Sequence, residues 1–252
     1  MTNVTKIFFS PSGTTKEVVA QIAGNFESSE EEYDLLNFNS TKEFNEDDLV
    51  IIGLPIFAGR LPKTASERLA KIKGNNTPAI AVTNYGNANV GDALLELRDI
   101  LVENNFNIIG AGTTISHHSI FSNVAVGRPD EDDIAKINEF AQKCKSKLES
   151  GELENVEIPG EKQGIELKQL PFLIGCDETL CAFCYDCVTV CPEKAIPDDD
   201  PVDTDFDLCS RCTACISICP EDARSFTGEA FESKKPVFEE ANSERKEPEF
   251  YL

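Results

Sequence analysis

The chain has 252 residues, of which 40% are hydrophobic and 27% charged, a composition that argues against wholesale disorder and allows one large domain plus a small one. No apolar run approaches the length of a membrane span, and the amino terminus lacks a signal-peptide pattern, so we expect a soluble, cytoplasmic protein. The formal net charge of −22 argues against binding to nucleic acid or anionic membranes.

Negative charge is concentrated in the C-terminal part of the chain. Residues 1–150 carry 14 Lys and Arg against 21 Asp and Glu, whereas residues 151–252 carry 9 against 24. Such a surface would steer partners with basic docking surfaces to the C-terminal part. Solubility alone is the alternative explanation. The sequence does not indicate an oligomeric state.

Residues 1–150 alternate between short apolar runs and helical patterns. Strands are predicted at residues 4–9, 31–38, 49–54, 78–83 and 106–115, and helices at residues 15–24, 63–73, 92–104 and 130–148. This alternation predicts the α/β class with a doubly wound, five-stranded parallel sheet. Ligands of such sheets bind beyond the carboxyl ends of the strands, so the loops after the first, third and fourth strands are expected to carry the chemistry.

The loop after the first strand is rich in hydroxyl groups. It contains Ser10, Ser12, Gly13, Thr14 and Thr15 directly before a helix. Hydroxyls and the free N–H groups of a helix N-terminus form an uncharged cradle for a phosphate, which the backbone can approach closely at a glycine. A Ser/Thr-rich helix cap is the alternative interpretation. Neither a P-loop nor a complete dinucleotide fingerprint is present.

Two further loops could enclose a flat ring. The loop after the third strand presents an aromatic side chain with small neighbours, and the loop after the fourth presents an aromatic beside a glycine; the candidate contacts are Pro55, Ile56, Phe57, Ala58 and Gly59, and Asn84, Tyr85, Gly86 and Asn87. Backbone amides could bind the polar edge of the ring, with an aromatic against its face. Alternatively, the aromatics only anchor their loops.

The remaining chain divides into three parts. Residues 151–170 have glycine, proline and charge without periodicity and are interpreted as a linker, residues 171–226 hold most of the cysteines, and residues 227–252 form an acidic tail with scattered aromatics. The acidic loop at 197–207 lacks the central Gly and terminal Glu of an EF-hand. We expect this loop to be solvated.

Eight of the ten cysteines form two runs of the pattern C-x-x-C-x-x-C-x-x-x-C-P. The first run is Cys181, Cys184, Cys187 and Cys191, and the second is Cys209, Cys212, Cys215 and Cys219. This spacing is typical of bacterial ferredoxins with [4Fe–4S] clusters, in which the last Cys of each run binds the other cluster. Two clusters are therefore expected, one on Cys181, Cys184, Cys187 and Cys219, and the other on Cys209, Cys212, Cys215 and Cys191.

The two runs form an internal repeat with an offset of 28 residues, which predicts a small pseudo-twofold α+β unit. Zinc is the first alternative, but its sites need four ligands, usually in two pairs. A disulfide framework is the second, and no secretory signal supports it.

Taken together, the chain resembles the EFR-type flavodoxin–ferredoxin fusion proteins, found mainly in anaerobes. The resemblance rests on the loop at 9–15, the segment at 53–62, Tyr85-Gly86-Asn87 and both cysteine runs. It implies a flavodoxin-like domain with FMN phosphate on Ser10, Ser12, Gly13, Thr14 and Thr15, and with isoalloxazine contacts from the other two loops. It also implies a ferredoxin-like domain with two [4Fe–4S] clusters.

The chain departs from the family pattern at two positions. Ser12 stands where flavodoxins usually carry Thr, and Tyr185 follows the second Cys where many ferredoxins have Gly. Both Ser and Thr offer a hydroxyl, so phosphate binding is still expected. Tyr185 could change the solvent exposure of its cluster and hence its reduction potential.

Four other residues have reactive side chains outside these motifs. His117 and His118 follow the fifth strand and could donate a proton near the flavin, but an ordinary loop pair is favoured. Cys144 is expected to be a buried packing residue. Cys176 lies five residues before Cys181 and could be a substitute ligand or a free thiol, although packing is expected.

We expect an electron-transfer protein that relays electrons between FMN, the two clusters and redox partner proteins, with no catalytic residue of its own. One alternative is an FMN-dependent reductase of a small substrate that receives electrons from the clusters. Another is a ferredoxin-type binding module without flavin.

Overall fold

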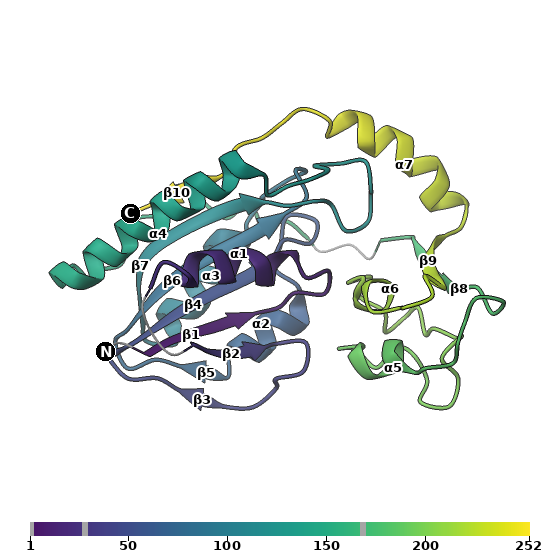
Figure 1. Ribbon diagram of the computed structural model, residues 1–252, viewed down its shortest axis with the longest axis horizontal. Helices are drawn as coiled ribbons and strands as arrows, with labels where there is room; N and C mark the ends of the chain where they lie inside the picture. The colour runs from purple at the N-terminus through teal and green to yellow at the C-terminus, as the bar shows by residue number, and fades with distance from the viewer. Residues whose placement is uncertain (1–2, 27–29, 167–169) are drawn as a thin grey trace.

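The computed structural model describes residues 3–26, 30–166 and 170–252, which form a larger lobe built on a sheet and a smaller lobe beside it (Figure 1). The larger lobe contains β1 (Asn3–Phe8), α1 (Thr14–Ala23), β2 (Glu30–Asp34), β3 (Lys42–Glu43), β4 (Asp48–Pro55), α2 (Lys63–Leu69), β5 (Ile72–Lys73), β6 (Thr77–Tyr85), α3 (Ala93–Glu103), β7 (Phe106–Ile115) and α4 (Glu131–Ser150). The smaller lobe contains β8 (Leu173–Cys176), α5 (Asp186–Val190), α6 (Ala214–Ser217) and β9 (Arg224–Thr227), and the chain ends with α7 (Glu229–Ala241) and β10 (Glu249–Tyr251).

The main sheet has the strand order β10-β7-β6-β4-β1-β2. Five of these strands are parallel, namely β2, β1, β4, β6 and β7 in their order across the sheet. When these five are numbered by their order along the chain, the order across the sheet is 2-1-3-4-5. This is the flavodoxin-like doubly wound topology, so the predicted fold class is confirmed.

Helices cover both faces of the sheet. On one face, Val19 of α1 and Phe140 of α4 pack with Ile51 of β4. On the other face, Leu69 of α2 and Leu97 of α3 pack with the next strand residue, Ile52. Successive side chains of a strand point to opposite faces, so both faces of the central strands are apolar and buried.

Two elements are shorter than their sequence patterns suggest. The predicted strand at 31–38 ends as β2 at Asp34, whose carboxylate accepts a hydrogen bond from the Leu36 N–H at 2.9 Å and starts a turn. The helix predicted at 63–73 ends at Leu69, because the buried Ile72 pairs with Lys42 in the small β3–β5 sheet.

The outer edge of β7 is covered by segments that the sequence did not indicate as structured. The C-terminal β10 pairs antiparallel with β7 and places Phe250 opposite Gly112. Nearer the start of β7, the Val156 N–H donates to the Ile108 carbonyl at 2.8 Å, and the Asn155 side chain accepts from the Ile108 N–H at 2.7 Å. Pairing in this way removes an exposed strand edge.

The smaller lobe lies beyond the carboxyl ends of the parallel strands, and α7 passes above it before the chain returns to the sheet (Figure 1). Its only sheet within the described residues is the antiparallel pair of β8 and β9. Phe231 of α7 packs with Phe226 of β9 and Phe121 of the larger lobe, so the C-terminal helix connects the two lobes. None of the described helices is both long and apolar enough to cross a bilayer.

We expect Phe250→Ala to lower the free energy of unfolding by on the order of 2 kcal/mol. The Phe250 ring stacks on Phe140 at 4.5 Å between centroids and occupies the space that a side chain at position 112 would fill. Chemical denaturation followed by circular dichroism measures the loss, with Leu252→Ala, which is 46% exposed, as the control. Equal stability of the two variants would mean that β10 does not stabilise the fold.

Candidate metal centre and flavin site

The two cysteine runs adopt the same local backbone. Six residues other than glycine have positive φ, in three pairs related by the repeat: Phe183 (53°) and Arg211 (58°), Tyr185 (64°) and Thr213 (76°), and Lys194 (54°) and Asp222 (51°). Positive φ is unfavourable for such residues and persists where surrounding structure requires it. Its recurrence in both runs indicates that the turns serve to direct the cysteines inward.

One cavity brings together cysteines of both runs. It is lined by Cys181, Cys184 and Cys187 of the first run and by Cys219, the last of the second run. This is the crossed set expected for one [4Fe–4S] cluster. We call it the first cluster site.

The other four cysteines also lie near one another. Burial raises the pKa of the Cys212 thiol to about 12, and the nearby Cys215 and Cys191 thiols add to the increase. Burial raises the pKa of the Cys215 thiol to about 12 as well; the Arg224 guanidinium opposes this increase, and the Cys209, Cys191 and Cys187 thiols add to it. Cys191 of the first run and Cys215 of the second run pack against the same small apolar cluster of Cys187, Val188 and Ile196. We call Cys209, Cys212, Cys215 and Cys191 the second cluster site.

Backbone amides point at the sulfur atoms in a repeated manner. The Ala195 N–H donates to Cys191 Sγ at 3.3 Å, and the repeat-related Ala223 N–H donates to Cys219 Sγ at 3.3 Å. Hydrogen bonds to ligand sulfurs favour the thiolate and tune the potential of a cluster.

The surroundings of the cysteines bear on the two alternatives. All ten cysteines, each within the described chain, are free of disulfides. Among the described residues, no three His, Cys, Asp or Glu side chains are arranged to hold a single metal ion. Five cysteines line the cavity of the first site, namely the four of the expected set and Cys176.

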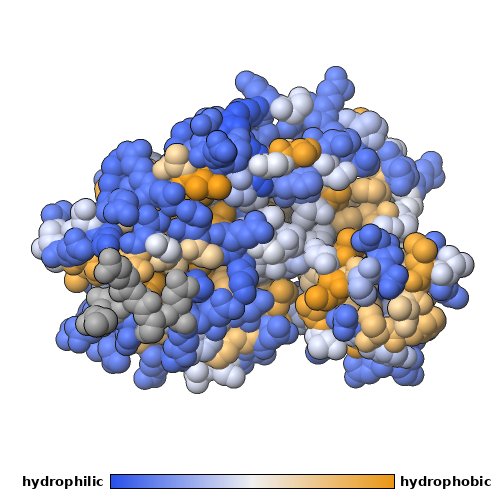
Figure 2. Space-filling view, viewed as in Figure 1, coloured by the Kyte–Doolittle hydropathy of each residue, from blue (hydrophilic) through white to orange (hydrophobic). Residues whose placement is uncertain are grey.

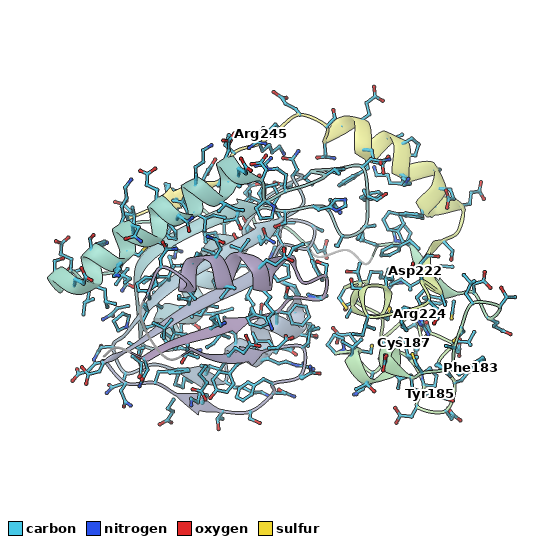
Figure 3. The ribbon with its side chains drawn as sticks, viewed as in Figure 1. Phe183, Tyr185, Cys187, Asp222, Arg224 and Arg245 are labelled. Carbon is cyan, nitrogen blue, oxygen red and sulfur yellow. The ribbon has the colours of Figure 1, made fainter. Side chains whose placement is uncertain are left out.

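A buried arginine that sequence reasoning missed lines the first cluster site (Figure 3). Arg224 is 2% exposed and donates to Thr204 Oγ1 at 2.9 Å and to the carbonyls of Pro201 and Asp203, but its Nε has no partner among the described residues. The repeat counterpart of Arg224 is Ile196, also buried. In the sequence, only this difference between the repeats, an arginine in place of an isoleucine, could have drawn attention to Arg224.

The two remaining cysteines differ in their surroundings. Cys144 is fully buried beneath β7, as expected for packing, and burial raises its pKa to about 12. Cys176 lines the first cluster site. In the antiparallel pair of β8 and β9, Cys176 is the residue that pairs with Arg224. Burial, together with the neighbouring Cys181, raises the pKa of Cys176 to about 11.

The three predicted flavin loops follow β1, β4 and β6, which are neighbours in the sheet. Their ends point toward the smaller lobe (Figure 1). Gly13 starts α1 with φ of 85°, no side chain caps the helix from that position, and the space beside the Gly13 Cα is open. The Ser10 hydroxyl accepts from the Lys16 N–H at 2.9 Å, and Ser12 Oγ lies 3.3 Å from Thr14 Oγ1. The first N–H groups of a helix have no intrahelical acceptor, so this loop fits an anion such as a phosphate.

The loop after β4 forms a tight turn in which Ala58 and Gly59 both have positive φ. The backbones of Phe57 and Arg60 close it with hydrogen bonds of 2.8 and 3.0 Å. Gly59 packs against Ile165, so the end of the linker lies beside this loop. Phe57 is partly exposed, as contact with a ring requires.

The loop after β6 is bound to other parts of the chain. Asn84 is buried, and its side-chain oxygen accepts from Thr114 Oγ1 at 3.0 Å and Ser116 Oγ at 2.9 Å. The Asn87 amide donates to the carbonyls of Asn242 and Glu244 at 2.9 and 2.7 Å. These two side chains thus have structural partners, whereas Tyr85 and Gly86 lie between them.

His118 has the environment of a structural residue. Its Nδ1 accepts from the Ile120 and Phe121 N–H groups at 3.1 and 3.3 Å, and its ring meets Phe121 and Phe238 edge-on. Burial and, secondarily, the charge of His117 lower the pKa of His118 to about 4. The ring is therefore neutral near pH 7.

Because the pKa of His118 is lower in the folded state than in the unfolded state, the unfolded state takes up the proton first as the pH falls. The stability linked to His118 is therefore fully present above the unfolded value of 6.5 and is lost progressively toward pH 4. We expect His118 to account for about 3 kcal/mol of stability lost over this interval. His118→Asn retains an acceptor but does not titrate, so the difference in stability between wild type and variant should change with pH. Melting by circular dichroism from pH 7 to pH 4 measures it, and a constant difference would contradict the assignment.

Comparisons with known proteins follow this division into two parts. Residues 202–225 match the family model described as 4Fe-4S binding domain, and no curated protein matches the chain. Flavodoxin 1 from Bacillus cereus is similar, with 19% identity, 57% of this chain and 98% of that chain covered, and a TM-score of 0.45. Rubredoxin oxygen:oxidoreductase from Desulfovibrio gigas is 14% identical, with 59% of this chain and 36% of that chain covered and a TM-score of 0.43. Flavodoxin from Fusobacterium nucleatum, bound to flavin mononucleotide, is 14% identical, with 58% of this chain and 99% of that chain covered and a TM-score of 0.41.

The strand order and the matched segment define the class: a flavodoxin-like α/β domain followed by a ferredoxin-like 4Fe-4S binding domain. The matched segment contains the second cysteine run only.

Proposed function

We propose that the protein is an electron-transfer iron–sulfur flavoprotein of the EFR type, which relays electrons between FMN, two [4Fe–4S] clusters and redox partner proteins. The observation that carries this proposal is the direct packing of the second cluster site on the flavodoxin-like domain. Cys212 and Ala214 belong to the same hydrophobic cluster as Leu69 and Leu97 of the larger lobe. The cofactors would therefore lie within one folded unit.

Polar contacts hold the same interface. Thr64 of α2 donates to the Glu193 carboxylate at 2.6 Å, and Arg68 of α2 donates to the Pro192 carbonyl at 3.0 Å. Glu193 and Pro192 directly follow Cys191, a member of the second cluster site. The larger domain thus fixes the backbone beside a cluster ligand.

FMN supplies an exchange of one or two electrons, whereas an iron–sulfur cluster carries one at a time. The residues of this chain contribute binding and orientation. The loop at 10–15 would hold the phosphate, the loops at 55–59 and 84–87 would border the ring, and the two crossed cysteine sets would hold the clusters. The reducing cytoplasm is the compartment that keeps such thiols available.

The environment of His118 argues against this residue as the proton donor of the alternative reductase. His118 is neutral, buried and hydrogen-bonded to backbone amides, so it has no proton to deliver at neutral pH from Nδ1. No other described feature favours a particular small substrate.

Anaerobic purification followed by analysis of iron, sulfide and flavin tests the proposal. We expect about eight iron, about eight sulfide and about one FMN per chain. Protein with iron but without FMN would support a flavin-free binding module and contradict the relay. Zinc in place of iron would refute both cluster sites.

The variant Ser12→Ala/Thr14→Ala should weaken FMN binding by at least about 100-fold, because each hydroxyl would donate to a charged phosphate. Both side chains are only partly buried and lie in the loop before α1. Fluorescence titration of the apoprotein with FMN measures the affinity, while the iron content should stay unchanged. Ser146→Ala, exposed on α4, is the matched control, and unaltered FMN affinity of the double variant would place the phosphate elsewhere.

A further inference from the structure

We propose that electrons leave the protein from the first cluster site, through a docking face formed by Leu180, Phe183, Tyr185 and Ile218, to a redox protein whose basic residues surround an apolar patch. This inference rests on the proposed function, since it assigns different roles to the two clusters. In this proposal electrons pass from the flavin to the second cluster, then to the first cluster, and from there to the partner.

The internal repeat allows the two sites to be compared position by position. In the first run Phe183 is 53% and Tyr185 38% exposed, whereas their counterparts Arg211 and Thr213 are 7% and 1% exposed. Cys184 between them is exposed, and its counterpart Cys212 is buried. The same local backbone is therefore open to solvent at the first site and covered at the second.

The cover over the second site comes in part from the larger domain. Cys212, Ala214 and the partly buried Val190 pack with the core of that domain. The counterpart of Val190 is Ile218, which is 45% exposed beside Cys219 of the first site. Contact with the flavodoxin-like domain thus breaks the symmetry of the repeat and leaves the first site facing outward.

The exposed apolar side chains are placed next to ligands of the first site. Leu180, 51% exposed, precedes Cys181, and Phe183 and Tyr185 flank Cys184. Phe183 and Tyr185 lie on the side of the smaller lobe away from the sheet (Figure 3), and hydrophobic residues are prominent on this lobe in Figure 2. Small interfaces with aromatic residues are typical of transient redox encounters.

The surrounding charge selects the kind of partner. Residues 171–226 contain 12 Asp and Glu but only 3 Lys and Arg. Two of these three, Arg211 and Arg224, are buried, so Lys194 is the only exposed base in this range. Exposed carboxylates stand close to the docking face in sequence, namely Asp177, Glu178, Asp186, Glu221 and Asp222. A basic partner would be attracted and oriented by them.

Each encounter transfers one electron. The iron–sulfur centre of the first site is oxidised by one electron and the metal of the partner is reduced by one, and no bond is formed or broken.

Stopped-flow mixing with ferric cytochrome c, a basic one-electron acceptor, tests the docking face. The full-length protein is reduced anaerobically and freed from reductant, and both clusters are measured by EPR before mixing. We expect Phe183→Ala/Tyr185→Ala to lower the second-order rate constant at least about tenfold, because two aromatic contacts are lost. Leu208→Ala should change it by less than about twofold, although Leu208 is 54% exposed beside Cys209 of the second site.

The rate for the wild-type protein should also fall as salt is added, because screening weakens the attraction. An unchanged rate for the double variant, or a larger loss for Leu208→Ala, would overturn the docking face. Wild-type protein without cluster signals before mixing would refute the proposed function itself.

Discussion

Replacement of Cys219 by alanine is expected to remove the first cluster and leave the second in place. The iron content should fall from about eight to about four per chain, because Cys219 completes the cavity of the first run. The experiment is best made in a Cys176→Ala background, because the Cys176 thiol lines the same cavity and could replace the missing ligand. Cys176→Ala alone should retain full iron content.

Double variants separate crossed from uncrossed ligation. With crossed ligation, Cys184→Ala/Cys219→Ala affects one cluster and retains about four iron, whereas Cys212→Ala/Cys219→Ala affects both clusters and loses nearly all iron. With each run holding its own cluster, these two results would be exchanged. Iron analysis and EPR of reduced protein decide between the two, and the exchanged outcome would contradict the assignment drawn from the cavity.

The second large effect is expected at Arg224. Reduction adds negative charge to a cluster, and a buried guanidinium beside it favours this charge. Arg224→Gln should therefore lower the equilibrium constant for reduction of the first cluster at least tenfold, which is about 59 mV for a one-electron couple. The second cluster should shift in the same direction, because the Arg224 guanidinium also acts to lower the pKa of the Cys215 thiol in that site.

EPR-monitored redox titration measures both midpoint potentials. Arg224→Lys keeps a positive charge and should shift the first potential less than Arg224→Gln does. Iron content and the circular dichroism spectrum show whether each variant is folded. Identical shifts in the two variants would indicate that hydrogen bonding and packing, rather than charge, are responsible. A higher potential at the first cluster is also the direction that favours electron flow toward the proposed docking face.

The fold class was predictable from local patterns, but element ends were not. The runs at 49–54 and 106–115 are apolar on both faces, which is typical of buried parallel strands, and they became β4 and β7. By contrast, β10 has only three residues and no recognisable pattern. It forms because Phe250 fits against Gly112 of the exposed β7 edge, a contact that depends on the assembled sheet.

The candidate sites were also predictable only in part. The spacing of the cysteines predicts two crossed sets, and the structure brings Cys219 into the cavity of the first run. The loops after β1, β4 and β6 lie together as a doubly wound sheet requires. The roles of Asn87, which holds the C-terminal segment, and Arg224, which lines the first site, were not predictable. Each depends on a partner far along the chain or on burial.

The sequence by itself determined the two-part architecture, the repeated cysteine spacing and the acidic character, because residue spacing, hydrophobic periodicity and charge are local properties. Only the tertiary structure decided which cluster site faces the flavodoxin-like domain and which faces solvent. The two cysteine runs are nearly equivalent as sequences, and they differ because one packs on the larger lobe. Burial of Arg224 against Thr204, Pro201 and Asp203 likewise depends on the folded smaller lobe, so no local pattern could have located this cation.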